Sequence, residues 1–287
     1  MAGALPRRAR ISLIGATVSI LALVVTWYVA HYVGFVKRAD VSILNGFAEL
    51  HRARLDRVTG FIARLCDPQR YVFLAAIPVL VALLRRRPRV AVTVGVILLA
   101  ANETTQLLKP LLAGPRDPVT WSSIGSASWP SGHATAAMSL ALCCVIACPA
   151  RRRPAIAAAM AAFAIAVCYS FLELGWHYPS DVFGGFLVAA TWAFLGAAGL
   201  SLYEARRRSQ VGQPPGQRPA FSLREALAPP ILLLAGAAVL AGLIVLARPH
   251  EVIDYVRVHE TFVLGAVVIA ALGLSLASGL MLMLRRS

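Results

Sequence analysis

Two histidines lie in short polar strings of an otherwise apolar chain, Pro130-Ser131-Gly132-His133 and His177-Tyr178-Pro179-Ser180-Asp181. Transfer of a phosphoryl group requires a nucleophile, an acid for the leaving group, and cations or N–H donors around the phosphate oxygens. Asp181 follows His177 by four residues, so its carboxylate can accept the ring N–H, fix the tautomer and stabilise the charged imidazole. This spacing makes His177 a candidate nucleophile and His133 a candidate acid.

The residues before His133 have the chemistry of a phosphate-binding site. Ser131 and Gly132 precede an apolar run, so their N–H groups are expected at a helix N-terminus, where anions bind. Gly132 also lets the backbone approach a ligand closely. Two cations, Lys109 and Arg116, lie upstream. Lys109 ends a polar helical face whose other members are Asn102, Thr105 and Gln106. Polar residues at membrane depth usually face a functional cavity, so this face is expected to lead to the site.

Each of these features also has a purely structural interpretation. Pro-Ser-Gly is a common turn string, and Ser180 has the chemistry of a helix N-cap. A single histidine in a loop is more often structural than catalytic. The phosphate-site hypothesis therefore depends on the convergence of two histidines, a carboxylate and two cations, and on no single residue.

The composition places the chain in a membrane. Hydrophobic residues make up 59% of the 287 residues, charged residues make up 14%, and the mean hydropathy is +0.71, values typical of integral membrane proteins. Crossing about 30 Å of hydrocarbon takes about 20 helical residues. The run 71–84 contains Pro78, and we expect it to use part of 58–70 or to rely on flanking arginines. Eight apolar runs are candidate spans: 11–35, 71–84, 90–108, 134–149, 154–174, 182–203, 230–247 and 261–284.

The formal charge of +15 follows the predicted topology. Arginine clusters flank alternate ends of successive spans, which is the pattern of positive loops that stay in the cytoplasm, and it argues against a nucleic-acid partner. Both termini are then cytoplasmic, and 36–70, 109–133, 175–181 and 248–260 lie outside with all the polar motifs. The clusters are Arg7/Arg8/Arg10, Arg85/Arg86/Arg87/Arg89, Arg151/Arg152/Arg153, Arg206/Arg207/Arg208 and Arg285/Arg286.

Outside the apolar runs, three segments have a distinct character. Segment 36–70 repeats apolar residues at three- and four-residue steps, which predicts an amphipathic helix at the membrane interface. Segment 204–228 has a linker composition and then a Ser222-x-x-Glu225 capping box, which predicts a short helix before Pro229. We therefore divide the chain into a core at 1–203, a cytoplasmic linker at 204–228 and a transmembrane hairpin at 229–287.

Neither the cysteines nor the acidic loop of the hairpin predicts a metal site. The five cysteines show no disulfide or metal-binding spacing, and we expect Cys66 alone to be accessible. The loop 248–260 contains His250, Glu251, Asp254, His259 and Glu260, and its spacing fits a solvated loop better than a metal cluster. We expect no metal and no cofactor.

The order of these motifs resembles the type 2 phosphatidic acid phosphatase (PAP2) superfamily, whose signature is Lys-x6-Arg-Pro, Pro-Ser-Gly-His and Ser-Arg-x5-His-x3-Asp. The resemblance covers the core to about residue 203 and implies an all-α, polytopic membrane bundle with six spans in the core, here with an added two-helix hairpin. It implies a phosphohistidine formed on His177, with His133 as proton donor and Asp181 as partner of His177. It also implies phosphate binding by Lys109, Arg116, Ser131 and Gly132.

Two residues depart from the signature. Asp117 separates Arg116 from Pro118, so its carboxylate could offset the guanidinium. Phe171 follows Ser170 where the third motif has arginine, and a phenyl ring cannot donate the bidentate contact to phosphate. Losing such a contact is worth about 3 kcal/mol, or roughly a hundredfold in rate. Retention of both histidines favours a weakened or retuned enzyme over an inactive one.

These observations lead to one expected function and two alternatives. We expect a membrane phosphatase that hydrolyses a lipid phosphate or diphosphate, of the polyprenyl diphosphate, phosphatidic acid or phosphatidylglycerophosphate type, at the outer face of the inner or plasma membrane. A lipid phosphotransferase, or a binding or transport protein without hydrolysis, are the alternatives. The lipid tail, the acceptor, the role of the hairpin and the oligomeric state are not determined by the sequence.

Overall fold

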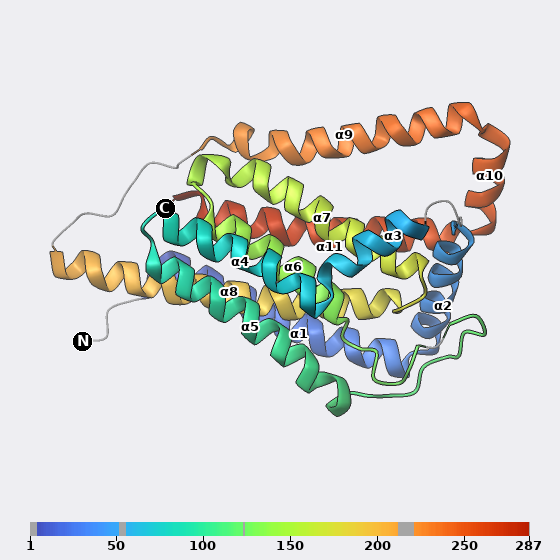
Figure 1. Ribbon diagram of the computed structural model, residues 1–287, viewed down its shortest axis with the longest axis horizontal. Coiled ribbons are helices and arrows are strands. Elements are labelled where there is room, and N and C mark those ends of the chain that lie inside the picture. Colours follow the sequence, from blue (N-terminus) through green and yellow to red (C-terminus); the bar gives the residue numbers. More distant parts are fainter. Residues whose placement is uncertain (1–4, 52–55, 123, 212–220, 287) are drawn as a thin grey trace.

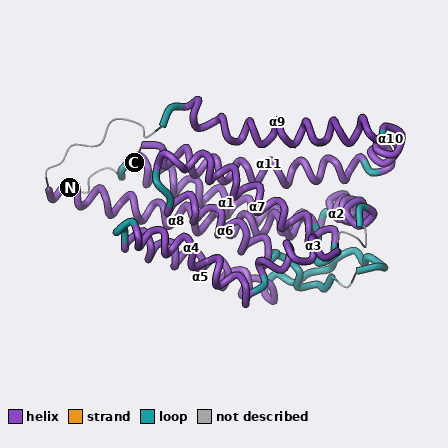
Figure 2. Tube along the Cα trace, turned by 45° about the horizontal axis from the view of Figure 1, so that its top comes forward, coloured by secondary structure: helices purple, strands orange, loops and turns teal. Residues whose placement is uncertain are grey.

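The computed structural model describes residues 5–51, 56–122, 124–211 and 221–286, and every regular element among them is a helix (Figures 1 and 2). Short 3-10 turns lie at Arg64–Cys66, Ala150–Arg152 and Leu284–Arg286. The α-helices are α1 (Arg7–Tyr32), α2 (Gly34–Glu49), α3 (Asp56–Ala63), α4 (Pro68–Leu84), α5 (Pro88–Leu111), α6 (Gly132–Ala147), α7 (Arg153–Glu173), α8 (Pro179–Val211), α9 (Leu223–Ala247), α10 (Pro249–Val258) and α11 (Glu260–Met283).

The long helices form one bundle with two distinct ends (Figure 1). Both chain termini lie at one end, which we call the terminal end. The opposite end, which we call the loop end, holds α2, α10 and the connection 112–131 between α5 and α6. Helix α6 lies inside the bundle, where it contacts α4, α5, α7, α8 and α11.

Six described helices are long and apolar enough to cross a membrane: α1, α5, α7 with its preceding turn, α8, α9 and α11. They correspond to six of the eight runs predicted from the sequence, and the chain is a multi-pass membrane protein. The other two runs, 71–84 and 134–149, form shorter helices, and the run 71–84 is joined to helical residues 56–66 as expected. Helix α4 has 17 residues, and it forms a bent pair with 56–66 at an angle of 63°. Helix α6 has 16 residues, or about 24 Å of rise, and it can be short because its neighbours surround it.

Glycines at the start of α8 let that helix reach the start of α6. A Cβ atom on Gly185 would lie 2.6 Å from the carbonyl oxygen of Ser131, and one on Gly184 would lie 2.7 Å from the Trp129 ring. Both separations are too short for any real side chain. The two helix starts that carry the polar motifs are therefore held in direct contact.

Several sequence predictions are wrong in detail. Segment 36–70 contains two helices, α2 and α3, and not a single interfacial one. Loop 248–260 is mostly helical as α10, because Pro249 begins a helix whose acidic first turn is stabilised by Glu251. Cys66 is buried, with 5% exposure, and all five cysteines are unpaired.

The predicted capping box at Ser222 and Glu225 is confirmed, but the helix that it begins is longer than predicted. Ser222 accepts from the N–H of Glu225, and Glu225 accepts from the N–H of Ser222. The helix does not end before Pro229 but continues to Ala247, which neighbouring hydrogen bonds permit in a membrane helix. The linker residues 212–220 lie outside the described residues.

The two long helices of the predicted hairpin have different surroundings. Helix α9 contacts α7 and leaves its apolar side chains exposed, as expected of a helix that faces lipid. Helix α11 instead packs against α7, α2, α6 and α8, and its Gly273 lies against Phe186 and Met138 of the bundle interior. Helix α11 is therefore part of the core packing, whereas α9 lies at its edge.

Candidate active site

His177 and Asp181 face each other at the loop end, where α8 begins. His177 Nδ1 lies 3.2 Å from Asp181 Oδ2, and that oxygen also accepts from the backbone N–H of Tyr178 at 3.1 Å. Asp181 is fully buried and His177 is 8% exposed. Donation from Nδ1–H to the carboxylate leaves the ring lone pair on Nε2, the atom that can attack a phosphorus.

His133 opens α6 and lies beside His177, with ring centroids 6.3 Å apart. Its Nε2 atom lies 2.9 Å from Oδ1 of Asp67, the residue that precedes α4. The Trp176 ring is 5.5 Å away. Burial lowers the pKa of His133, and the carboxylate of Asp67 acts in the opposite direction by stabilising the protonated imidazole, which is the form that an acid catalyst needs.

The first turn of α6 and the last turn of α5 meet next to His133. Ser131 caps α6 by accepting from the N–H of Ala134 at 3.3 Å, and its own N–H donates to the Asp181 carbonyl oxygen at 2.9 Å. A Cβ atom on Gly132 would lie 4.0 Å from Lys109 Nζ. A cation and a helix N-terminus therefore converge on one point, an arrangement suited to an anion.

The polar face of α5 continues inward from Lys109 and is hydrogen-bonded to neighbouring helices. Thr105 Oγ1 lies 2.9 Å from Thr135 Oγ1 of α6. Asn102 donates to the Tyr71 hydroxyl at 3.4 Å, and that hydroxyl lies 3.0 Å from Ser139 Oγ. These contacts fix the rotation of α5 about its axis. The polar side chains of Asn102 and Thr105 therefore have a structural role in helix packing.

Arg116 lies behind the histidine pair, between two buried carboxylates. It is ion-paired with Asp181 through Nη2 and lies 3.6 Å from Asp40 Oδ2 through Nη1. Its side chain is 5% exposed, and its guanidinium carbon lies 4.6 Å from the centroid of the Tyr178 ring. In this arrangement Arg116 holds Asp181 in place, and Asp181 in turn holds His177.

Asp40, on α2, is a buried member of this cluster that the motifs do not contain. It accepts from the N–H of Ser180 at 3.0 Å and from its hydroxyl at 2.5 Å. One guanidinium faces two carboxylates here, so the cluster has an excess negative charge. Burial raises the pKa of Asp40 to about 7, because a desolvated carboxyl without a full counter-charge favours its neutral form.

The two departures from the motif pattern have structural counterparts. The Asp117 carboxylate pairs with Lys37 at 2.5 Å and not with Arg116. Phe171 is fully buried, with its ring 5.4 Å from His177 and 6.0 Å from His133. An apolar ring therefore packs under both histidines at the position where the motif has arginine.

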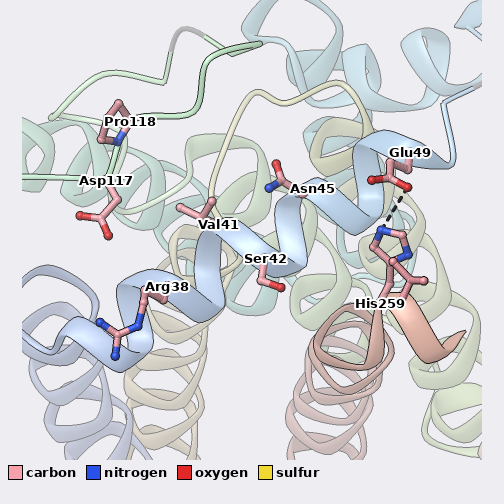
Figure 3. A pocket seen from close by; sticks show the side chains of 9 residues that line it. Arg38, Val41, Ser42, Asn45, Glu49, Asp117, Pro118 and His259 are labelled. Carbon is pink, nitrogen blue, oxygen red and sulfur yellow. Dashed lines mark ion pairs between the residues drawn. The ribbon is translucent and has the colours of Figure 1, made fainter. Parts of the chain in front are cut away.

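A separate cavity of about 420 Å³ lies on the other face of α2, with Asp117 and Pro118 along one side (Figure 3). His259, at the start of α11, closes its far end by pairing with Glu49 at 3.0 Å. Asp40 points the opposite way, since it shares the buried face of α2 with Leu44. This cavity is therefore distinct from the histidine cluster, although α2 borders both.

The structure brings together every site residue predicted from the sequence: Lys109, Arg116, Ser131, Gly132, His133, His177 and Asp181. Sequence reasoning missed Asp40 and Asp67. A signal for Asp40 was present, because it lies four residues before Leu44 on the apolar face of α2 and must be buried with partners. Asp67 carries no such signal, since only the fold brings the start of α4 to His133.

Two comparisons with known proteins gave a match. Residues 85–204 match the family model described as PAP2 superfamily. Among solved structures, the crystal structure of "the first transmembrane PAP2 type phosphatidylglycerolphosphate phosphatase from Bacillus subtilis" is similar with a TM-score of 0.49 and 20% sequence identity, over 67% of this chain and 96% of that one. A comparison with curated proteins gave no match. The segment that matches the PAP2 superfamily model, residues 85–204, contains all seven site residues predicted from the sequence.

Proposed function

We propose that this protein is a membrane lipid phosphatase that works through a phosphohistidine on His177. The observation that carries the proposal is the pairing of two histidines with different partners, His177 with Asp181 and His133 with Asp67, next to a helix N-terminus and Lys109. Each partner favours the state that its histidine needs, an oriented base for one and a protonated acid for the other.

The reaction follows from these positions. His177 Nε2 attacks the phosphorus and forms a P–N bond while the bond from phosphorus to the leaving oxygen breaks, and His133 gives that oxygen a proton. Water, losing its proton to His133, then attacks the phosphorus of the phosphohistidine, the P–N bond breaks, and inorganic phosphate leaves with His177 restored. Lys109 and the N–H groups of Gly132 and His133 in the first turn of α6 neutralise the charge on the non-bridging oxygens, whereas the N–H of Ser131 is already bonded to the Asp181 carbonyl oxygen. No step uses a metal or a cofactor.

Arg116 has a supporting role in this scheme. Its guanidinium is already paired with Asp181 and lies beside Asp40, so its main effect is to keep Asp181 ionised and in register with His177. The negative charge of the phosphate is then neutralised mainly by Lys109 and by the N–H groups at the start of α6. This division favours a retuned enzyme, consistent with the replacement of the motif arginine by Phe171.

The proposed substrate is a lipid phosphate or diphosphate whose tail stays in the bilayer. The site lies at the loop end of a bundle with lipid-facing helices, so a headgroup can enter while the tail remains between the helices and the membrane. We propose that this end is extracytoplasmic, with both termini in the cytoplasm of a cell bearing the protein in its inner or plasma membrane. The arginine clusters at the terminal end support this orientation.

Orientation can be tested separately from chemistry. Thr120, in the loop-end connection, and Gln210, near the end of α8, are both exposed. In intact cells, an impermeant maleimide should label a Thr120→Cys variant, while Gln210→Cys should react only after the cells are opened. Labelling of Gln210→Cys in intact cells would reverse the proposed topology.

The central experiment measures inorganic phosphate released by the purified full chain from phosphatidic acid, phosphatidylglycerophosphate and a polyprenyl diphosphate, with and without excess chelator. We expect release from at least one substrate, unchanged by chelator. A strict divalent-cation requirement would remove the mechanism. Transfer of phosphate to an added alcohol in place of water would favour the phosphotransferase, and binding without turnover would favour a carrier.

A further inference from the structure

A cavity of about 530 Å³ at the terminal end is lined by arginines that come from distant parts of the chain. Arg7 and Arg8 come from the start of α1, Arg208 from the end of α8, and Arg285 from the turn after α11. Ser201 and Glu204, also on α8, complete the polar wall. We call this site the basic cleft. Asp181 and Glu204 are 23 residues apart on α8, so the cleft lies about 35 Å from the candidate active site.

Charge in and around the basic cleft is strongly unbalanced. Among the described residues that line the basic cleft, Glu204 is the one acidic residue. Its carboxylate lies 3.9 Å from Arg8 and 3.8 Å from Arg87. A neighbouring cavity of about 380 Å³ also borders Glu204 and adds four more arginines: Arg86, Arg87, Arg89 and Arg207. The described residues that line these two cavities therefore include one carboxylate and eight guanidinium groups, which gives the region a positive potential.

Arg8 is held differently from arginines that serve only as orientation signals. An orientation signal needs only a positive charge in a cytoplasmic loop, and exposed arginines such as Arg10 and Arg152 meet that need. In contrast, the side chain of Arg8 is 21% exposed, and its Nη2 atom is buried without a hydrogen-bond partner among the described residues. A buried guanidinium N–H without an acceptor is costly, and it points to an anionic ligand.

The wall of the cleft also has an apolar part that faces the lipid. Ile11 of α1 and Leu282 of α11 line it, and they are 41% and 36% exposed. A phosphate group could bind the guanidinium forks bidentately, while acyl chains would lie along these two residues. A soluble phosphate would use only the polar part of this surface.

We propose that the basic cleft binds the phosphate headgroup of an anionic phospholipid from the leaflet at the terminal end, with its acyl chains against α1 and α11. Such a lipid would join three helices that the sequence places far apart, α1, α8 and α11. It would therefore stabilise the bundle from the end opposite the site of the proposed reaction. This inference does not depend on phosphatase activity.

Binding can be measured on the purified full chain in a neutral detergent. The probe is phosphatidylglycerol, a phosphodiester that the proposed phosphatase would not cleave, and the comparison lipid is phosphatidylcholine. We expect native mass spectrometry to show preferential retention of phosphatidylglycerol, and the melting temperature to rise with this lipid only. Soluble glycerophosphate at the same concentration should have no comparable effect, and an equal effect would overturn a lipid site in favour of a free-phosphate site.

Matched variants locate the effect. Arg8→Gln combined with Arg208→Gln should weaken phosphatidylglycerol binding at least tenfold, whereas Arg10→Gln with Arg152→Gln removes the same charge outside the cleft and should leave binding unchanged. Equal weakening by both pairs would show a diffuse surface attraction and overturn the proposal. If the cleft variant does not fold, Glu204→Gln gives an independent test, because removing the lining carboxylate should tighten binding, and unchanged or weaker binding would contradict the site.

Discussion

Replacement of Phe171 by arginine tests how the active site compensates for its departure from the motif. Phe171 is fully buried and packs against His177 and His133, with ring centroids 5.4 and 6.0 Å away. The Phe171→Arg variant restores the motif cation but removes this packing. Its benefit would act on the transition state, and its cost would act on folding, so the two effects can be measured separately.

The free energy lost from packing is expected to exceed the free energy gained from the restored phosphate contact. A restored phosphate contact in a closed site is worth about 3 kcal/mol, or roughly a hundredfold in rate. Removing a fully buried phenyl ring costs about 3–5 kcal/mol, and an arginine at this position also loses hydration without a carboxylate of its own. Asp181 is already committed to Arg116 and His177. We therefore expect the melting temperature to fall by roughly 6–20 °C, with phosphate release per folded molecule unchanged or lower.

The assay compares three proteins in detergent: the natural chain, Phe171→Arg and Phe171→Leu. The leucine variant keeps an apolar side chain without adding charge, so it should lose little stability and little activity. Activity must be normalised to the folded fraction, measured by size-exclusion chromatography. A gain of about a hundredfold in phosphate release by Phe171→Arg without loss of stability would refute the packing argument and would mark the natural protein as an attenuated phosphatase.

Three further predictions concern the cluster around Phe171. His177→Ala should abolish phosphate release with any leaving group, whereas His133→Ala should recover part of its activity on an aryl phosphate, because an activated leaving group needs less protonation; equal recovery by both variants would contradict the assigned roles. Gly185→Ala should reduce activity at least tenfold, since its Cβ atom would lie 2.6 Å from a backbone oxygen at the start of α6, while Gly199→Ala on the same helix meets nothing within 4 Å and should be silent. Burial raises the pKa of Asp40 to about 7 in the folded protein from an ordinary value of 3.8, so its contribution to stability is present at low pH and lost as pH rises through 7. Between pH 4 and pH 7 the melting temperature of the natural chain should therefore fall, by an amount equivalent to at most about 4 kcal/mol, and the slope should flatten in Asp40→Asn; an unchanged slope in the variant would exclude Asp40 as the titrating group.

The sequence predicted those parts of the structure that depend on local pattern. Apolar runs of sufficient length gave six of the membrane helices, and the Ser222-x-x-Glu225 string gave a helix start with both reciprocal hydrogen bonds. The pair His177 and Asp181 was also accessible, because a four-residue spacing brings two side chains together with little help from the rest of the fold. In the capping box and in the His177–Asp181 pair, the interacting residues lie within about one helical turn of each other.

Features that depend on tertiary contacts were not predicted. The partners of Asp40 are an example, since Arg116 and Ser180 lie on distant segments of the chain. The partner of His133 is another, since Asp67 lies 66 residues earlier. Burial of Cys66 likewise depends on helices that pack over the α3–α4 bend. Local sequence contains no information about which distant segment covers a residue.

The replacement at Phe171 and the position of Arg116 are two aspects of one electrostatic solution. Arg116 is held by Asp181 and Asp40, so it contributes little net positive charge to an incoming phosphate. The site then depends on Lys109 and on the N–H groups at the start of α6, and the strength of both rises as water is excluded. A buried phenyl ring beneath both histidines excludes water where an arginine would have kept it. We infer that Phe171 exchanges one direct cation for a drier site in which the remaining donors act more strongly, and that the arginine cannot be restored without losing that environment.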